Sequence, residues 1–321
     1  MDTNYLEQRW SKLIPDKIPG YRAIRISDDR TNELYLGINS QLKRCLILCL
    51  PKGEHPHYPD DIKEYISLEY FDLSSHIIIK LIDDNFKDLF NDLIISIYQR
   101  IRFIEIEIDA AQKFIKTYYK WGEFFNNSIS KKLSKEEIQG LFGELFVLGE
   151  LIKESKAQLV NEILQSWQGP YDRTHDFIQD TKDTEVKTLE IPKIDVRISS
   201  EYQLDSVPGK GLFLHIVSVE MNSENSISIR QLANVLKELI SDRLGDTSIL
   251  LKALGKKNLT ATNILEYDNY RFETKTLDIY DCLAEGFPRL INSNIPPEVN
   301  SLKYNLRVSL ISDFIVSHKV Y

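Results

Sequence analysis

Apolar and polar positions alternate over short runs in the first third of the chain, which is the pattern of strands. The runs that predict strands are residues 21–26, 34–38, 44–50, 65–71 and 76–81. Over residues 86–119 the apolar positions recur at helical spacing, with a break near residues 103–108, where β-branched residues alternate with Glu. This pattern predicts a β-rich α+β domain over residues 1–105 and a helical connector over residues 106–130.

The remainder of the chain, residues 131–321, mixes helical and strand patterns. Ser134, with Glu137 three residues later, predicts a capping box, so a helix should begin near Lys135. Strands are expected at 194–199, 212–221, 270–277 and 302–310, and amphipathic helices at 229–244 and 247–254. The run 212–221 is apolar on both faces and suits a central strand. We expect an α/β domain with a mixed central sheet flanked by helices.

Charged residues gather in one predicted hairpin of this region. Asp176 precedes Glu185 by nine residues, and the polar stretch 179–182 between them suits a turn. A turn centred there places Asp176 opposite Glu185, with Cβ atoms about 4.5–5.5 Å apart. Glu185 and Lys187 then share one face of their strand, while Val186 points into the core. Two carboxylates that close repel each other unless a cation lies between them.

A third acid, Glu144, lies in a helical run of apolar residues from Leu141 to Ile152. An acid in such surroundings is unusual unless it is exposed or held at a polar site. We expect Glu144 to approach the hairpin from the adjoining layer.

Three carboxylates and a lysine are the groups that metal-dependent phosphodiester hydrolysis uses. Asp176, Glu185 and the carbonyl of Val186 would bind Mg²⁺, or Mn²⁺ in its place. Lys187 would orient the attacking water and stabilise charge on the phosphate. Glu144 would bind a second ion or a metal-bound water. The alternative interpretation is an exposed, charged hairpin without chemistry.

An acid, any residue and a lysine occur in this order elsewhere in the chain. The other occurrences are 61–63, 154–156, 180–182 and 273–275, and Pro59-Asp60-Asp61-Ile62-Lys63 contains the proline as well. The run 185–187 differs from these by its context. It has a strand acid upstream at hairpin distance, a helical acid before that, and an apolar residue between its two charged ones.

Five blocks of sequence carry a resemblance to a known group of proteins. They are residues 140–145, 167–170, 175–177, 185–188 and 198–204. Together they resemble a bacterial family of PD-(D/E)XK motif proteins within the PD-(D/E)XK nuclease superfamily. The resemblance implies a restriction-endonuclease-like core in which Glu144, Asp176 and Glu185 match the acid positions and Lys187 the lysine. His175 stands where the superfamily motif has proline. A role in bacterial defence against foreign DNA, with protein partners, is also implied.

The net charge of −8 opposes binding to a polyanion unless basic residues form a local face. The candidate contacts to DNA are Lys193, Arg197, Ser199, Gln203 and Lys210, with further lysines at 131, 132, 135, 256 and 257. Ordinary solvated charges are an equally good interpretation of each lysine and of Arg197, and a half-exposed strand is an equally good one for 194–199. Weak intrinsic affinity for DNA, with delivery by a partner protein, follows as a hypothesis.

The chain has no apolar stretch that predicts a membrane span and no basic start followed by an apolar run, so we expect a cytoplasmic protein. Its three cysteines are too few and scattered for a disulfide framework or a zinc site. His55 and His57 lie in a proline-rich loop and are not expected to bind metal. We expect the aromatic residues of 118–125 to pack, and His215 to be a hydrogen-bonded core residue.

Two other functions stay open on the sequence alone. A catalytically silent scaffold or interaction module inside a larger defence complex fits the acidic charge, but fits the intact acid and lysine set poorly. A nuclease that acts on RNA is not separable from one that acts on DNA, because no residue pattern reports on the 2′-hydroxyl. The oligomeric state is equally open.

Overall fold

The computed structural model describes residues 1–14, 20–26, 33–51, 58–125, 132–296, 298–299 and 301–321. The chain forms two compact units. The first unit comprises Met1–Ile129 with Thr260–Thr262, and the second comprises Ser130–Leu259 with Asn263–Tyr321.

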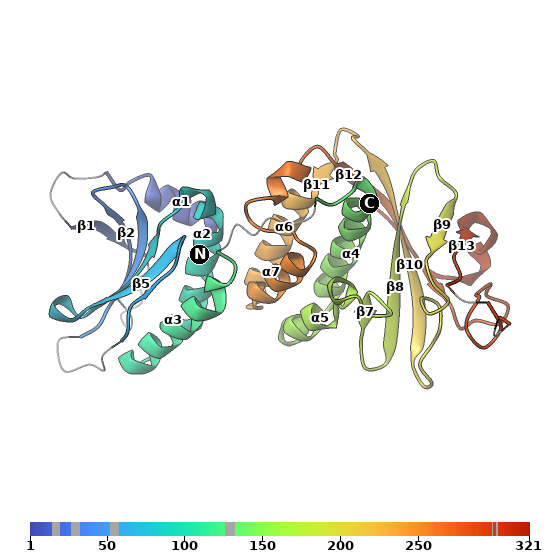
Figure 1. The fold of residues 1–321 in the computed structure, drawn as a ribbon, viewed down its shortest axis with the longest axis horizontal. Helices are drawn as coiled ribbons and strands as arrows, with labels where there is room; N and C mark the ends of the chain where they lie inside the picture. The colour runs from blue at the N-terminus through green and yellow to red at the C-terminus, as the bar shows by residue number, and fades with distance from the viewer. Residues whose placement is uncertain (15–19, 27–32, 52–57, 126–131, 297, 300) are drawn as a thin grey trace. The chain divides into compact units, whose positions relative to one another are not determined.

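The first unit is an antiparallel sheet covered on one face by helices (Figure 1). Its strands, in the order β1-β2-β3-β6-β5-β4, are β1 (Tyr21–Arg25), β2 (Glu33–Asn39), β3 (Arg44–Cys49), β6 (His76–Leu81), β5 (Ile66–Phe71) and β4 (Asp61–Ile62). Its helices are α1 (Thr3–Trp10), α2 (Lys87–Ile101) and α3 (Glu107–Gly122). The five predicted strands and the break near residues 103–108 are confirmed, whereas α1 and β4 were not predicted. Because α3 packs within this unit, residues 107–122 are not a separate connector.

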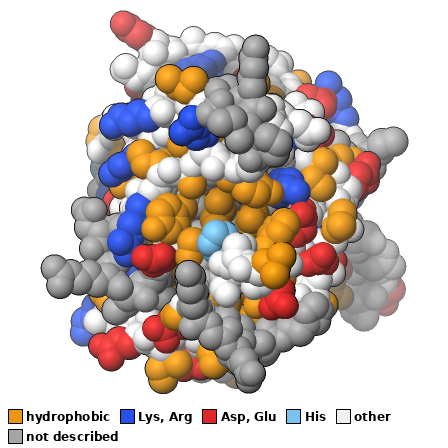
Figure 2. All heavy atoms as spheres, turned by 90° about the vertical axis from the view of Figure 1, so that its left-hand side faces the viewer, with side chains coloured by type: hydrophobic (Ala, Val, Ile, Leu, Met, Phe, Trp, Pro, Cys, Tyr) orange, Lys and Arg blue, Asp and Glu red, His pale blue; other side chains and the backbone are white. Residues whose placement is uncertain are grey.

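Apolar side chains lie on the sheet face opposite the helices. Figure 2 shows them gathered round a histidine, with basic and acidic side chains around them. The cluster comprises Cys45, Ile47 and Ile78, with Tyr21, Tyr35 and Cys49 partly buried against it. The alternation of β2, β3 and β6 therefore buries apolar residues on both faces of this sheet.

Aromatic residues near the end of the first unit pack into its core, as predicted. Tyr118 and Trp121 are fully buried, and the Tyr118 hydroxyl donates to the carbonyl of Asp61 at 3.0 Å. Tyr119 alone of these three is substantially exposed, at 43%. His55 and His57 lie outside the described residues.

The second unit is a mixed sheet with helices on one face and a small sheet on the other (Figure 1). Its main sheet runs β11-β12-β10-β8-β7, with β14 also pairing β12, and comprises β7 (Phe177–Ile178), β8 (Lys182–Glu190), β10 (Gly211–Met221), β11 (Ile227–Ser228), β12 (Arg271–Asp281) and β14 (Ile315–Val320). The helices are α4 (Lys135–Glu154), α5 (Val160–Ser166), α6 (Ile229–Asp242) and α7 (Thr247–Lys256). The small sheet pairs β9 (Asp195–Ile198) with β13 (Tyr304–Arg307). Strands β8 and β10 are parallel, and the other pairs are antiparallel.

The helices start where their capping residues stand. Ser134 accepts from the backbone N–H of Glu137, whose side chain accepts from the N–H of Ser134, so α4 begins at Lys135 as predicted. Ser228 and Gln231 form the same box at the start of α6. One apolar core fills the space between these helices and the sheet, and a second lies on the other face, against β9 and β13.

Helix α4 approaches β8 closely because two residues permit it. A Cβ atom on Gly143 would lie only 2.0 Å from Oγ1 of Thr188 in β8, so this position has no room for a side chain. One turn earlier, the Gln139 amide donates to the carbonyl of Thr188 at 3.0 Å. This contact sets the height of α4 over β8, and therefore the position of the residue that follows Gly143, Glu144.

One expectation about this unit is confirmed, and another is confirmed only in part. The predicted strand at 194–199 exists as β9, but it pairs with β13 in the small sheet and does not extend the main one. His215 is buried in β10 as predicted, yet its Nδ1 has no hydrogen-bond partner. Burial lowers the pKa of His215 to about 3, which keeps its ring neutral. The last strand, β14, was not predicted.

The spacing of α4 and β8 gives a matched pair of substitutions. Gly143→Ala should lower the free energy of unfolding by about 1–3 kcal/mol, because its methyl group meets Thr188 and overpacks the interface. Gly140→Ala has open space on the same helix and should be neutral or stabilise by up to about 1 kcal/mol. Urea unfolding of both variants measures the difference. Equal stability of the two would show that α4 is not held at this distance by Gly143.

Candidate active site

The predicted hairpin forms with the expected pairing. Phe177 pairs with Thr184 and Ile178 with Asp183, a register that continues to Asp176 opposite Glu185. Oδ2 of Asp176 accepts from the backbone N–H of Val186 at 2.8 Å. This hydrogen bond fixes the Asp176 carboxylate against β8 beside Glu185.

Lys187 is held by two partners on the same face. Its Nζ donates to Oε1 of Glu185 at 2.7 Å and to Oε1 of Gln203 at 3.1 Å. The same Gln203 oxygen accepts from the backbone N–H of Ser199 at 2.7 Å, which fixes the amide in turn. The ammonium is mostly buried, with its side chain 16% exposed, and Val186 points into the core on the opposite face.

Glu144 reaches the hairpin from α4. Its Oε2 accepts from the indole N–H of buried Trp167 at 2.7 Å. A Cβ atom on Gly169 would lie 2.3 Å from Oε2 of Glu144 and 2.8 Å from Oδ1 of Asp176. These two carboxylate oxygens therefore face one small space that only glycine leaves clear.

Burial disfavours the charged forms of all three acids, and repulsion between carboxylates adds to it for Glu144 and Glu185. Burial first, and the charge of Asp176 second, raise the pKa of Glu185 to about 8 and that of Glu144 to about 8. Burial likewise raises the pKa of Asp176, although the hydrogen bond from Val186 opposes it. Perturbed acids gathered around a lysine are typical of a functional site.

A second charged cluster lies behind the hairpin. Lys210 donates to the carbonyl of Gln179 at 2.6 Å and to Oδ1 of Asp183 at 3.2 Å. Nδ1 of His175 lies 3.6 Å from the other oxygen of Asp183, and burial lowers the pKa of this imidazole. Lys210 thus braces the turn of the hairpin and does not form part of an open basic face.

No preformed metal cluster is present among the residues that the structure describes: no three Asp, Glu, His or Cys side chains are grouped closely enough to hold an ion as they stand. Two observations nevertheless fit a cation. Oδ1 of Asp176 accepts no hydrogen bond from a described residue, and the three acids have raised pKa values that a cation would lower.

The sequence model of one family matches residues 6–309 of this chain, and that family is described as "Putative PD-(D/E)XK family member, (DUF4420)". The chain belongs to this family. The mixed sheet with its flanking helices is the restriction-endonuclease-like α/β core of a PD-(D/E)XK protein. No curated protein and no solved structure matches the chain.

The other acid and lysine motifs of this PD-(D/E)XK protein lie in different surroundings. Glu273 and Lys275 on β12 form an ion pair of 2.7 Å, but Glu273 is half-buried and no second carboxylate among the described residues raises its pKa; hydrogen bonds from Lys275 and Ser223 lower it. Asp61 and Lys63 belong to the first unit. The neighbouring acids, and not the short motif itself, distinguish Glu185 and Lys187 on β8 from the other occurrences.

The remaining candidates are scattered around the PD-(D/E)XK core. Lys193 and Arg197 are exposed, and Lys193 pairs with Glu190 at 3.3 Å. Ser199 and Gln203 serve to hold Lys187. Among the further lysines, Lys132 lies 3.8 Å from Glu266 and Lys135 pairs with Glu190 at 3.0 Å, while Lys131 lies outside the described residues.

Two residues of the site, Trp167 and Gly169, were missed as functional groups. Both lie in a block that carried the family resemblance, which was the available signal. Lys257, named only as one of several lysines, is near enough to lower the pKa of Glu144 and Asp176 by its charge. No helix among the described residues combines the length and apolar character needed to cross a bilayer.

The raised pKa of Glu185 predicts how the stability of the metal-free protein depends on pH. Because the folded-state pKa of about 8 exceeds the ordinary value of 4.5, the folded protein binds more protons than the unfolded chain between these values. The free energy of unfolding therefore falls as the pH rises from 4.5 to 8. Glu185→Gln mimics the neutral form and should raise the melting temperature in EDTA at pH 8 more than at pH 5.

Glu273→Gln is the control, because the hydrogen bond from Lys275 lowers the pKa of this acid and no such gain is expected. Thermal unfolding followed by circular dichroism at both pH values measures the effect. An equal shift of Glu185→Gln at pH 5 and pH 8 would contradict the assignment of a buried, ionising carboxyl.

Proposed function

We propose that this PD-(D/E)XK protein is a metal-dependent nuclease that hydrolyses phosphodiester bonds in DNA. The observation that supports it best is the position of Asp176, whose carboxylate lies beside that of Glu144 and accepts from Val186, next to the ion pair of Glu185 and Lys187. The family description supports a nuclease-like fold. Participation in a bacterial defence system, with partner proteins, rests on the family resemblance of the sequence.

The donor set suits a hard divalent cation, Mg²⁺ or Mn²⁺. Asp176, Glu185 and the carbonyl of Val186 would hold it with oxygen atoms, and Glu144 would bind a second ion or a metal-bound water. A bound ion would lower the pKa of water and offset the charge of the phosphate. Because Gly169 has no side chain, the carboxylate oxygens of Glu144 and Asp176 stay accessible to a bound ion.

Lys187 is the group that would act on the attacking water and on the phosphate. The hydrogen bonds from its Nζ to Glu185 and Gln203 use two of its three donors, which leaves one N–H for the reaction. Because Gln203 is itself fixed by Ser199, the ammonium is oriented before substrate arrives. Ser199 and Gln203 are therefore proposed as positioning residues and not as DNA contacts.

Contacts to the DNA backbone would come from cations that are exposed or half-buried. Arg197 and Lys193 lie on and beside β9, and Lys257 lies beside the acids. Lys210 is excluded from this role by its two hydrogen bonds to the hairpin. The small number of such cations agrees with weak intrinsic affinity for DNA and delivery by a partner.

Removing the acid or the lysine of β8 should abolish cleavage. Glu185→Ala loses a metal ligand, and Lys187→Ala loses an oriented cation whose removal should lower the rate at least about 10²-fold. Supercoiled, linear and single-stranded DNA incubated with Mg²⁺, Mn²⁺ or EDTA measures cleavage and shows whether it starts at ends.

The matched control is Glu273→Ala, which breaks the same acid and lysine pairing with the same 2.7 Å separation on another strand, β12. This variant should cleave like the wild type. Cleavage by Glu185→Ala at the wild-type rate would refute the nuclease assignment to this site. Silence of the wild type on DNA and RNA alike, with intact binding to a partner protein, would favour the scaffold function.

Gly169→Ala tests the space between the carboxylates. Its methyl group would displace Glu144 and Asp176, so cleavage should fall by at least about tenfold, an effect of 1.4 kcal/mol on the barrier. Gly255→Ala, at the end of α7 with open space around it, is the control and should retain activity. Steady-state cleavage rates at saturating Mg²⁺ measure both. A Gly169→Ala enzyme with full activity would remove Glu144 from the proposed site.

A further inference from the structure

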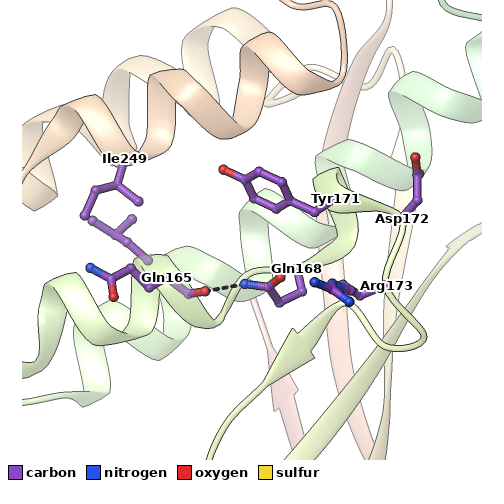
Figure 3. A pocket seen from close by; sticks show the side chains of 7 residues that line it. Gln165, Gln168, Tyr171, Asp172, Arg173 and Ile249 are labelled. Carbon is purple, nitrogen blue, oxygen red and sulfur yellow. Dashed lines mark hydrogen bonds between the residues drawn. The ribbon is translucent and has the colours of Figure 1, made fainter. Parts of the chain in front are cut away.

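A pocket opens beside the acids of the second unit. It has a volume of about 510 Å³ and lies between α5, α7 and the loop that leads to β7 (Figure 3). Its lining comprises Leu164, Gln165, Gln168, Tyr171, Asp172, Arg173 and Ile249. The volume lies within the range of about 300–1,000 Å³ that is usual for ligand sites.

The pocket and the proposed active site share one segment of backbone. The N–H groups of Gln168 and Gly169 both donate to the carbonyl of Asp176, at 2.7 and 3.1 Å. Gly169 faces the carboxylates of Glu144 and Asp176, and its neighbour in the sequence, Gln168, lines the pocket. A ligand that spans both places would have one group at the acids and the next group in the pocket.

The walls of the pocket offer a flat apolar surface and an amide. Tyr171, which is 37% exposed, points across the pocket towards Ile249, and Gln165 lies along the side (Figure 3). Gln168 is fixed because its Nε2 donates to the carbonyl of Gln165 at 2.7 Å. The side-chain amide of Gln165 makes no hydrogen bond with a described residue, so both its donor and its acceptor face solvent.

The rim of the pocket carries one exposed cation. Arg173 is exposed and forms no ion pair with any residue that the structure describes. The one acid of the lining, Asp172, points away from the pocket in Figure 3, and its carboxylate lies 3.6 Å from Nζ of Lys257. An anionic group at the rim would therefore meet Arg173 without facing an unpaired carboxylate.

We propose that this pocket binds an unpaired base of the nucleic-acid strand, adjacent to the phosphate at the acids. This inference rests on the proposed function. The base stacks on Tyr171, its polar edge meets the amide of Gln165, and Arg173 contacts a neighbouring phosphate. Because a base inside a duplex cannot enter such a pocket, the protein favours single-stranded or locally opened DNA.

The test measures binding in the Lys187→Ala background with Mg²⁺ present, so that the strand is not cut. Fluorescence anisotropy of a labelled single-stranded oligonucleotide gives the affinity. Adding Tyr171→Ala should weaken binding about tenfold, the scale of one lost stacking contact, whereas Tyr171→Phe keeps the ring and should bind normally. Tyr119→Ala, which removes a tyrosine of similar exposure from the first unit, is the control.

A series of oligonucleotides with one abasic site at successive positions identifies the base. One position should weaken binding by about as much as Tyr171→Ala, and in the Tyr171→Ala protein that position should have no further effect, because both changes remove the same contact. A duplex of the same sequence should bind more weakly than the single strand.

Unchanged affinity of Tyr171→Ala, or an abasic effect that persists undiminished in it, overturns the pocket assignment and leaves the nuclease proposal standing. Displacement of the strand by free deoxynucleoside monophosphate without any abasic effect also overturns it, in favour of a mononucleotide site. If Glu185→Ala cleaves like the wild type, the proposed function fails instead, and the comparison of Tyr171→Phe with Tyr171→Ala still decides whether the pocket takes a base.

Discussion

Helix α4 and strand β8 lie so close that a glycine and a threonine are in contact, and the position of Glu144 depends on this approach. Gly143 has no room for a Cβ atom against Thr188, and Gln139 bonds to the carbonyl of the same threonine. Because Glu144 directly follows Gly143, this approach sets where its carboxylate lies, with its Oε2 next to Oδ1 of Asp176. A small change in helix height would separate the acids that the proposed chemistry needs together.

The electrostatic state of these acids follows from their burial. Three carboxylates with raised pKa values are destabilising when charged and metal-free, and one lysine does not balance them. Trp167 and the backbone of Val186 hold two of them in place with hydrogen bonds despite this cost. The fold thus holds the carboxylates close together although their burial and repulsion cost free energy, an arrangement that is typical of functional sites.

The loop between α5 and β7 contributes both to the proposed active site and to the pocket beside it. Its Gly169 makes space between carboxylates, and its neighbours Gln168 and Tyr171 line a pocket. Both features depend on the two N–H groups of this loop that bond to the carbonyl of Asp176. The acid that would bind metal and the wall that would bind a base are therefore parts of one hydrogen-bonded unit.

The sequence alone determined features that depend on neighbours in the chain. A polar turn and the two-residue period of strands set Asp176 opposite Glu185, and a capping box started α4 at Lys135. Only the tertiary structure decided that Trp167 binds Glu144, that Gln203 orients Lys187, and that β9 pairs with β13 and not with the main sheet. These contacts join segments that are distant in sequence. The spacing of apolar residues in a segment indicates which of its faces is buried, but not which other segment packs on that face.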